Sequence, residues 1–104
     1  MGIGTSGAFD GNYRGEYVSG VVTVATTQVE AKVGASALEQ REDLLIFNDG
    51  TDTIFFGPSG VATSGANKGI PVESGEFLRI PASGSVSIFL ISDGSSDVIV
   101  QELG

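Results

Sequence analysis

The residue types that could do chemistry are few in this chain, and the missing types exclude most catalytic sites. The 104 residues contain no cysteine and no histidine. Their absence excludes thiolate metal sites, cysteine nucleophiles and the commonest general base near neutral pH. The Gly-x-Ser-x-Gly pattern does not occur, and a Ser–Lys pair could use only Lys32 or Lys68. We therefore expect neither an enzyme nor a cofactor.

Two short segments gather carboxylates and hydroxyls, which are the oxygen ligands that calcium prefers. They are residues 48–52 (Asn-Asp-Gly-Thr-Asp) and 93–97 (Asp-Gly-Ser-Ser-Asp). Neither matches the twelve-residue EF-hand loop, and only two or three carboxylates converge in each. Solvated turns explain them better, so we predict no metal site, with calcium binding at these turns as the alternative.

A third candidate is the glycine-rich stretch 57–69. It lacks the Gly-Lys-Ser/Thr sequence that a phosphate-binding loop requires. Long excursions between strands of a compact domain are uncommon, and they often contact other molecules. We expect partner contacts here through Val61, Asn67 and Lys68, with a passive connection as the alternative.

The charge pattern excludes two classes of partner. The formal net charge is −8, and the five basic residues are scattered singly along the chain. No basic patch could neutralise phosphates, so nucleic acid and anionic membrane surfaces are not expected as partners. No apolar run reaches the length of a membrane span.

The elements that must position these residues are strands. Residues 28–33 alternate, with Val29, Ala31 and Val33 on one side and polar residues on the other. We predict an all-β fold over 21–104, a single β-sandwich that is jelly-roll-like or a small Greek-key barrel, with residues 35–41 as a connecting loop. The expected strands are 21–24, 28–33, 44–47, 53–56, 76–80, 85–91 and 97–103.

Residues 46–56 and 90–100 share one pattern, an apolar run, Asp-Gly and a second apolar run. Asp-Gly favours the tight turn of a hairpin, so the pattern predicts two β-hairpins of similar build. Their likeness is explained either by the general similarity of hairpins or by an internal duplication.

Residues 1–20 contain six glycines and few apolar side chains, so we expect an extended N-terminal arm that precedes the sandwich domain 21–104. Phe9, Tyr13 and Tyr17 recur at intervals of four. We expect these aromatics to anchor the arm on a neighbouring subunit or partner, with packing on their own sandwich as the alternative.

The order of motifs between Val21 and Leu103 resembles a known family. Arg41, Leu44, Ile46 and Asn48 fit the strand pattern R-x-x-L-x-I-x-N. A later segment, Gly69-Ile70-Pro71-Val72 followed by Gly75-Glu76, is similar to G-I-P-L-x-x-G-E. Both patterns are typical of small β-sandwich proteins in the virions of tailed bacteriophages, and the resemblance covers about four-fifths of the chain.

The resemblance implies a non-enzymatic structural protein, made in the host cytoplasm and carried in the virion. Its expected role is capsid decoration, or cement, on the major capsid protein or another virion protein. We expect self-association, because a chain this short has a limited core, and a trimer suits a threefold lattice position. The alternatives are a tail or connector component, or a glycan- or calcium-dependent binding module that uses residues 57–69 and the Asp-Gly turns.

Overall fold

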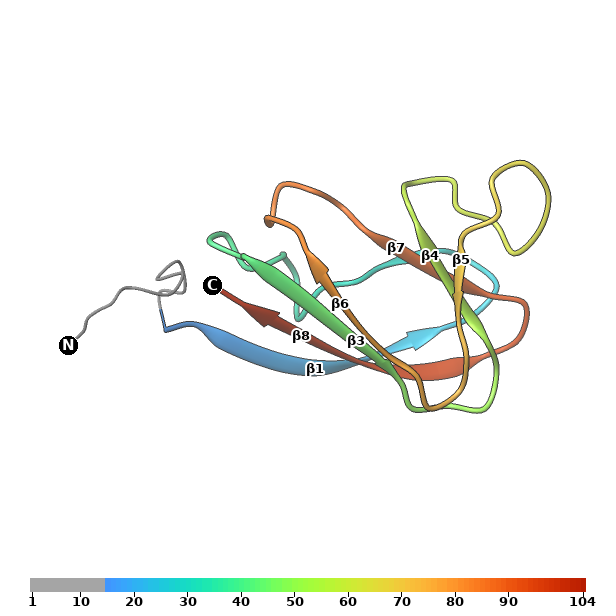
Figure 1. The fold of residues 1–104 in the computed structure, drawn as a ribbon, viewed down its shortest axis with the longest axis horizontal. Helices are drawn as coiled ribbons and strands as arrows, with labels where there is room; N and C mark the ends of the chain where they lie inside the picture. The colour runs from blue at the N-terminus through green and yellow to red at the C-terminus, as the bar shows by residue number, and fades with distance from the viewer. Residues whose placement is uncertain (1–14) are drawn as a thin grey trace.

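The protein is a β-sandwich. A computed structural model describes residues 15–104, which form two four-stranded antiparallel sheets and no helix (Figure 1). At this level the predicted fold class is confirmed. The strands are β1 (Tyr17–Val24), β2 (Val29–Glu30), β3 (Asp43–Asn48), β4 (Ile54–Gly57), β5 (Ile70–Val72), β6 (Phe77–Pro81), β7 (Phe89–Ser92) and β8 (Ser96–Leu103).

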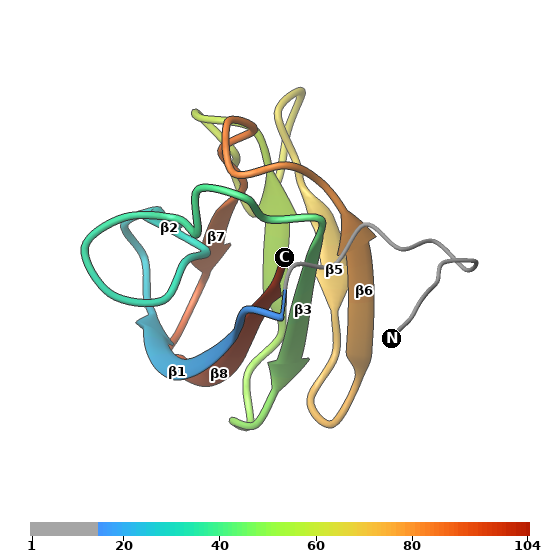
Figure 2. The same cartoon turned by 90° about the vertical axis from the view of Figure 1, so that its left-hand side faces the viewer.

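The first sheet, here called sheet A, has the strand order β1-β8-β3-β6, and sheet B has the order β2-β7-β4-β5. Figure 2 shows β1 and β8 of sheet A side by side, below β2 and β7 of sheet B. The two strand orders are related. If four is added to each strand number of sheet A, with β1 following β8, the order becomes β5-β4-β7-β2, which is the order of sheet B in reverse. The chain is therefore pseudosymmetric in its topology.

The core lies between the sheets and follows the period of two expected of strands. In sheet A the even-numbered positions face inward. Buried apolar side chains there include Val24 of β1, Leu44 and Ile46 of β3, and Val98 and Val100 of β8. The predicted alternation of residues 28–33 also holds: Ala31 is fully buried, and Val29 and Val33 pack against the core. Only Val29 and Glu30 pair as a strand.

The two predicted hairpins are wrong. β3 belongs to sheet A and β4 to sheet B, while β7 belongs to sheet B and β8 to sheet A. Each Asp-Gly segment is therefore an arch that carries the chain from one sheet to the other. The Asp-Gly pair marks a turn, but it does not decide which sheet the following strand joins.

The arches share a local hydrogen-bond pattern. The Asn48 side chain accepts a hydrogen bond from the Gly50 N–H (3.2 Å), and the Ser92 hydroxyl accepts one from the Gly94 N–H (3.1 Å). These side-chain turns bend the chain out of the sheet directly after β3 and β7. The arches also pack together, because a Cβ at Gly50 would overlap Ser96 and a Cβ at Gly94 would overlap Asp52.

The sandwich begins earlier than the expected boundary at Val21. β1 starts at Tyr17, and residues 17–20 pair with residues 100–103 of β8. Gly20, one of the glycines that suggested an arm, lies within the strand, where a Cβ would approach Val33 Cγ1 to 3.3 Å. The glycine thus permits a close approach rather than marking irregular chain. Phe9 and Tyr13 lie outside the described residues.

Removing residues 17–20 is expected to destabilise the fold. A chain that begins at Val21 loses half of the β1–β8 pairing, and the lost backbone hydrogen bonds contribute about 2–4 kcal/mol in total. A chain that begins at Gly15 keeps this pairing and is the matched control. Thermal denaturation followed by circular dichroism should place the melting temperature of the shorter chain about 10 °C or more below that of the control. Equal melting temperatures would contradict the assignment of residues 17–20 to the sheet.

Candidate functional site

The candidate site is the outer surface of sheet A. An apolar row crosses all four strands, because Val21 pairs with Ile99, Ile99 with Phe47, and Phe47 with Phe77. The next row is Ser19, Gln101, Leu45 and Arg79, and the third is Tyr17, Leu103, Asp43 and Pro81. We call these three rows the sheet A face.

The sheet A face exposes large apolar side chains at both of its edges. Val21 on β1 is 66% exposed, and Phe77 on β6 is 59% exposed. Between them a shallow hollow of about 240 Å³ is lined by Leu45, Ile46, Phe47, Phe77, Ile99 and Gln101. A contiguous exposed apolar patch on a sheet surface is often a site of contact with another molecule.

The apolar surface continues around the edge of sheet A. A second hollow, of about 430 Å³, lies where β5 and β6 meet and includes Phe56, Ile70, Pro71 and Phe77 in its lining. Ile70 is itself 61% exposed. Phe77 therefore stands between two apolar hollows.

Tyr17 is the predicted anchor that the structure describes. Its side chain lies on the sheet A face, and its hydroxyl donates a hydrogen bond to Gln101 Oε1 (2.8 Å). Tyr17 is thus part of the sandwich surface rather than of an arm. It remains exposed, at the end of the face that is close to Gly15.

The predicted loop residues separate into one buried and two exposed positions. Val61 is buried and packs beneath Gly57 and Gly69, so its side chain offers no surface to a partner. Asn67 and Lys68 are exposed. The loop is held by backbone hydrogen bonds from Ala62 N–H to Asn67 O and from Gly69 N–H to Ala62 O, both 2.9 Å.

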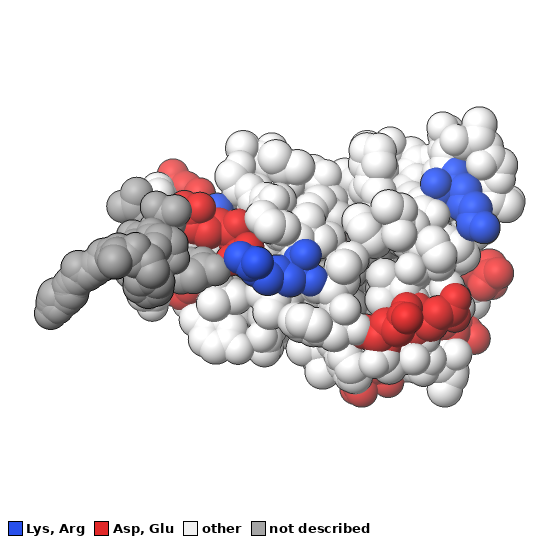
Figure 3. Space-filling view, in the orientation of Figure 1, with Lys and Arg blue, Asp and Glu red and all other residues white. Residues whose placement is uncertain are grey.

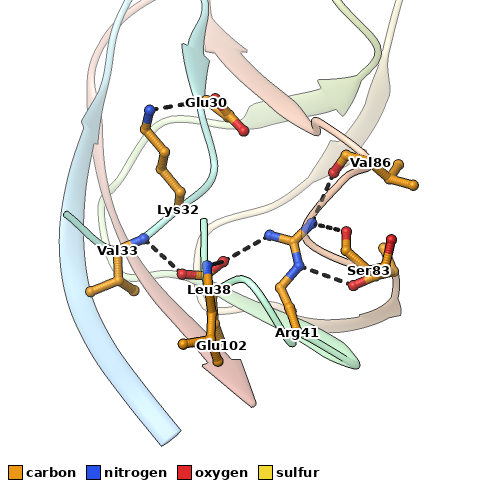
Figure 4. A network of polar contacts seen from close by, with 9 residues as sticks. Glu30, Lys32, Val33, Leu38, Arg41, Ser83, Val86 and Glu102 are labelled. Carbon is orange, nitrogen blue, oxygen red and sulfur yellow. Dashed lines mark hydrogen bonds and ion pairs between the residues drawn. The ribbon is translucent and has the colours of Figure 1, made fainter. Parts of the chain in front are cut away.

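The strongest electrostatic feature was missed by sequence reasoning, and it is internal. Arg41 and Glu102 form an ion pair of 2.9 Å with both side chains almost fully buried (Figure 4). The Arg41 guanidinium also donates to the backbone carbonyls of Ala82, Ser83 and Val86 at 2.8–3.0 Å. The sequence signal for the burial of Glu102 is its position in β8, because it follows Val98 and Val100 at the same alternate, inward-facing positions.

Glu102 completes the cluster by accepting two backbone hydrogen bonds. Its carboxylate receives the N–H groups of Val33 (3.1 Å) and Leu38 (3.2 Å). The ion pair therefore joins the connection 31–42, the connection 82–88 and β8. Such a saturated pair, closed to solvent, positions backbone rather than binding substrate.

A second internal cluster centres on Asn48. Its side-chain amide donates to the carbonyls of Asp52 (2.8 Å) and Val72 (2.9 Å), and its Oδ1 accepts from the Ser96 hydroxyl. The backbone of Asn48 bonds Gly75 and Glu76. The two segments of the family resemblance, 41–48 and 69–76, thus meet at this residue.

The Asp-Gly arches, both within the described residues, gather no cluster of three acidic side chains. Within residues 15–104, no three His, Cys, Asp or Glu side chains lie so that they could hold a metal ion. Asp52 Oδ2 accepts the Ser95 N–H (2.9 Å), and Asp97 Oδ1 accepts the Thr23 hydroxyl (2.9 Å). These carboxylates act within the fold.

The surface charge is unevenly distributed. In the orientation of Figure 1, acidic side chains gather in separate groups toward the two ends, and much of the surface between them is uncharged (Figure 3).

The part of the chain that the structure describes contains no helix long and apolar enough to cross a membrane.

Comparison of the chain with protein families, with curated proteins and with solved structures finds no match.

Glu102→Leu is expected to lower the free energy of unfolding by about 3–5 kcal/mol, because Arg41 would remain buried without its counter-charge. Glu42→Leu removes a neighbouring but exposed carboxylate and should change stability by less than about 0.5 kcal/mol. Urea denaturation measures both. Similar losses in the two variants would show that the buried pair does not fix the connections.

Proposed function

We propose that this chain is a non-enzymatic structural protein of a tailed-bacteriophage particle, a decoration protein that binds the assembled shell and stabilises it. It is made in the host cytoplasm and carried in the virion. The observation that carries the proposal is the exposed loop 58–69, which presents Asn67 and Lys68 at the surface, where long loops often contact other molecules. The chain contains no histidine and no cysteine, the residue types that most often act as general base and thiol nucleophile.

The assignment to a phage particle rests on the resemblance, and the structure adds one supporting point. The residues of its two motifs are neighbours in space. Asn48 from the first motif bonds Val72, Gly75 and Glu76 from the second. The resemblance therefore concerns one connected unit of the fold rather than separate short matches.

The topology is compatible with this role. The orders β1-β8-β3-β6 and β2-β7-β4-β5 are those of a jelly roll, an architecture of viral capsid domains, lectins and cupins. Because one fold supports many functions, the order of strands does not by itself select among them.

Purified particles are expected to contain many copies of the protein, in proportion to the positions of the shell lattice. Quantitative mass spectrometry of the particles measures the copy number. A copy number that matches a single ring would instead assign the protein to the tail or connector. Absence from particles would overturn the proposal.

The loop 58–69 is the proposed contact with the shell. Its Lys68 is exposed, with Nζ 5.8 Å from the centre of the Phe55 ring. Lys68→Glu is expected to raise the Kd for the shell at least about tenfold, and so to lower occupancy at subsaturating protein concentration, because reversal of an interface charge costs more than about 1.4 kcal/mol.

Lys32→Glu is the matched control for this variant. It makes the same change of charge in the connection 31–42, where Lys32 pairs with Glu30 at 3.5 Å. Its occupancy should stay close to that of the unchanged protein. Equal occupancy of the two variants, measured by sedimentation of decorated particles, would exclude the loop as the contact.

A further inference from the structure

We propose that the sheet A face binds the same face of a second copy of this chain, giving a two-fold symmetric dimer. This goes beyond the proposed function, because it assigns a surface and a partner that exist without any particle. It also differs from the trimer expected from the sequence. A cyclic trimer joins two different patches, whereas the sheet A face is one patch that can meet itself.

The apolar part of the face is continuous. Val21, Ile99, Phe47 and Phe77 form an unbroken row from one edge strand of sheet A to the other. Within residues 15–104, Tyr17, Val21 and Phe77 are three of the five large apolar side chains that are exposed. Water on this surface is displaced most favourably by an equally broad apolar surface.

The area of the face suits a weak, reversible dimer. Four strands about 4.8 Å apart, with five residues of about 3.3 Å in each, give roughly 19 Å by 17 Å, or about 320 Å² in projection. Two facing copies would bury about 640 Å² in projection, and the relief of the side chains adds to this, so the interface falls in the range below roughly 1,200 Å² that is typical of transient contacts. The hollow of about 240 Å³ in the same face is smaller than the roughly 300–1,000 Å³ of ligand pockets.

The charge of the chain also favours this face for self-association. Two copies that each carry a formal charge of −8 repel one another over most of their surfaces. Within the three rows of the face, the charged side chains are Arg79 and Asp43, and they pair with each other at 2.9 Å. These three rows therefore add no net charge to the contact between two copies, and the nearest unbalanced charge on the same side of sheet A is Asp97, in the next row.

The polar side chains of the face are already hydrogen-bonded within it. The Tyr17 hydroxyl donates to Gln101 Oε1 (2.8 Å), and Gln101 Nε2 donates to the Ser19 hydroxyl (3.2 Å). Burying these groups therefore leaves few hydrogen bonds unsatisfied, which lowers the cost of removing water.

A two-fold axis parallel to the strands makes the row self-complementary. It places β1 of one copy over β6 of the other, so Val21 faces Phe77 and Ile99 faces Phe47. Each contact then sets a branched aliphatic side chain against an aromatic ring, as in the interior of a sandwich.

Sedimentation equilibrium of the purified chain, into the high micromolar range, tests the proposal. The expected result is a reversible monomer–dimer equilibrium. Phe77→Lys should raise the dimer Kd at least about 100-fold, because it buries an unpaired charge at the interface. Val21→Lys, on the opposite edge strand, should act in the same way and provides an independent second position.

Val86→Lys is the control. Val86 is also exposed (51%) but lies in the connection 82–88, outside the face, so the dimer Kd should change less than about threefold. Circular dichroism checks that all variants fold. A trimer, a dimer that both face variants leave intact, or equal weakening by Val86→Lys would overturn the proposal.

A monomeric chain would also overturn it. If removal of residues 1–14 then produced a dimer, that segment and not a second copy would be the occupant of the face. Copy number on particles does not enter these measurements, so failure of the dimer and failure of the proposed function are separate outcomes.

Discussion

The buried ion pair between Arg41 and Glu102 is the interaction on which one end of the sandwich depends. The connections 31–42 and 82–88 contain no strand of their own, so their backbone groups need other partners. Arg41 satisfies three carbonyls of one connection, and Glu102 satisfies two N–H groups of the other. The connections are so close that a Cβ at Gly84 would overlap the Leu38 carbonyl.

Asn48 has the corresponding role at the other end of the same strands. β3 and β8 run antiparallel, so Arg41 and Glu102 lie at one end of the pair, and Asn48 and Ser96 lie at the other. Both ends are fixed by polar side chains in inward-facing positions, while the middle is apolar. The apolar middle supplies most of the driving force for folding, and the polar ends determine where the chain changes sheet.

The sequence located most of the strands, although β5 was not expected and β2 and β7 are shorter than expected, but it did not determine how the strands assemble. Alternation identified the inward side of residues 28–33, and β-rich runs located β3, β4, β6 and β8 to within a few residues. The same signals could not distinguish an arch from a hairpin, because Asn48 and Ser92 act through contacts that only the folded chain forms. Tyr17 was misplaced because the glycines beside it favoured an irregular segment. The burial of Arg41 and Glu102 was not predicted because charged residues are normally exposed. The alternation along β8 nevertheless places Glu102 on the same side of the strand as Val98 and Val100.

The pairing of β1 with β8 has a consequence for how the protein is made. β8 lies between β1 and β3 in sheet A, and Tyr17 pairs with Leu103. During translation, β1 therefore has no pairing partner, and β3 can pair only with β6, until residues 96–103 have left the ribosome. Such distant contacts make folding slow, and both strands expose unpaired edges in the meantime. The nascent chain is most open to aggregation, and most in need of chaperones, just before its last strand emerges.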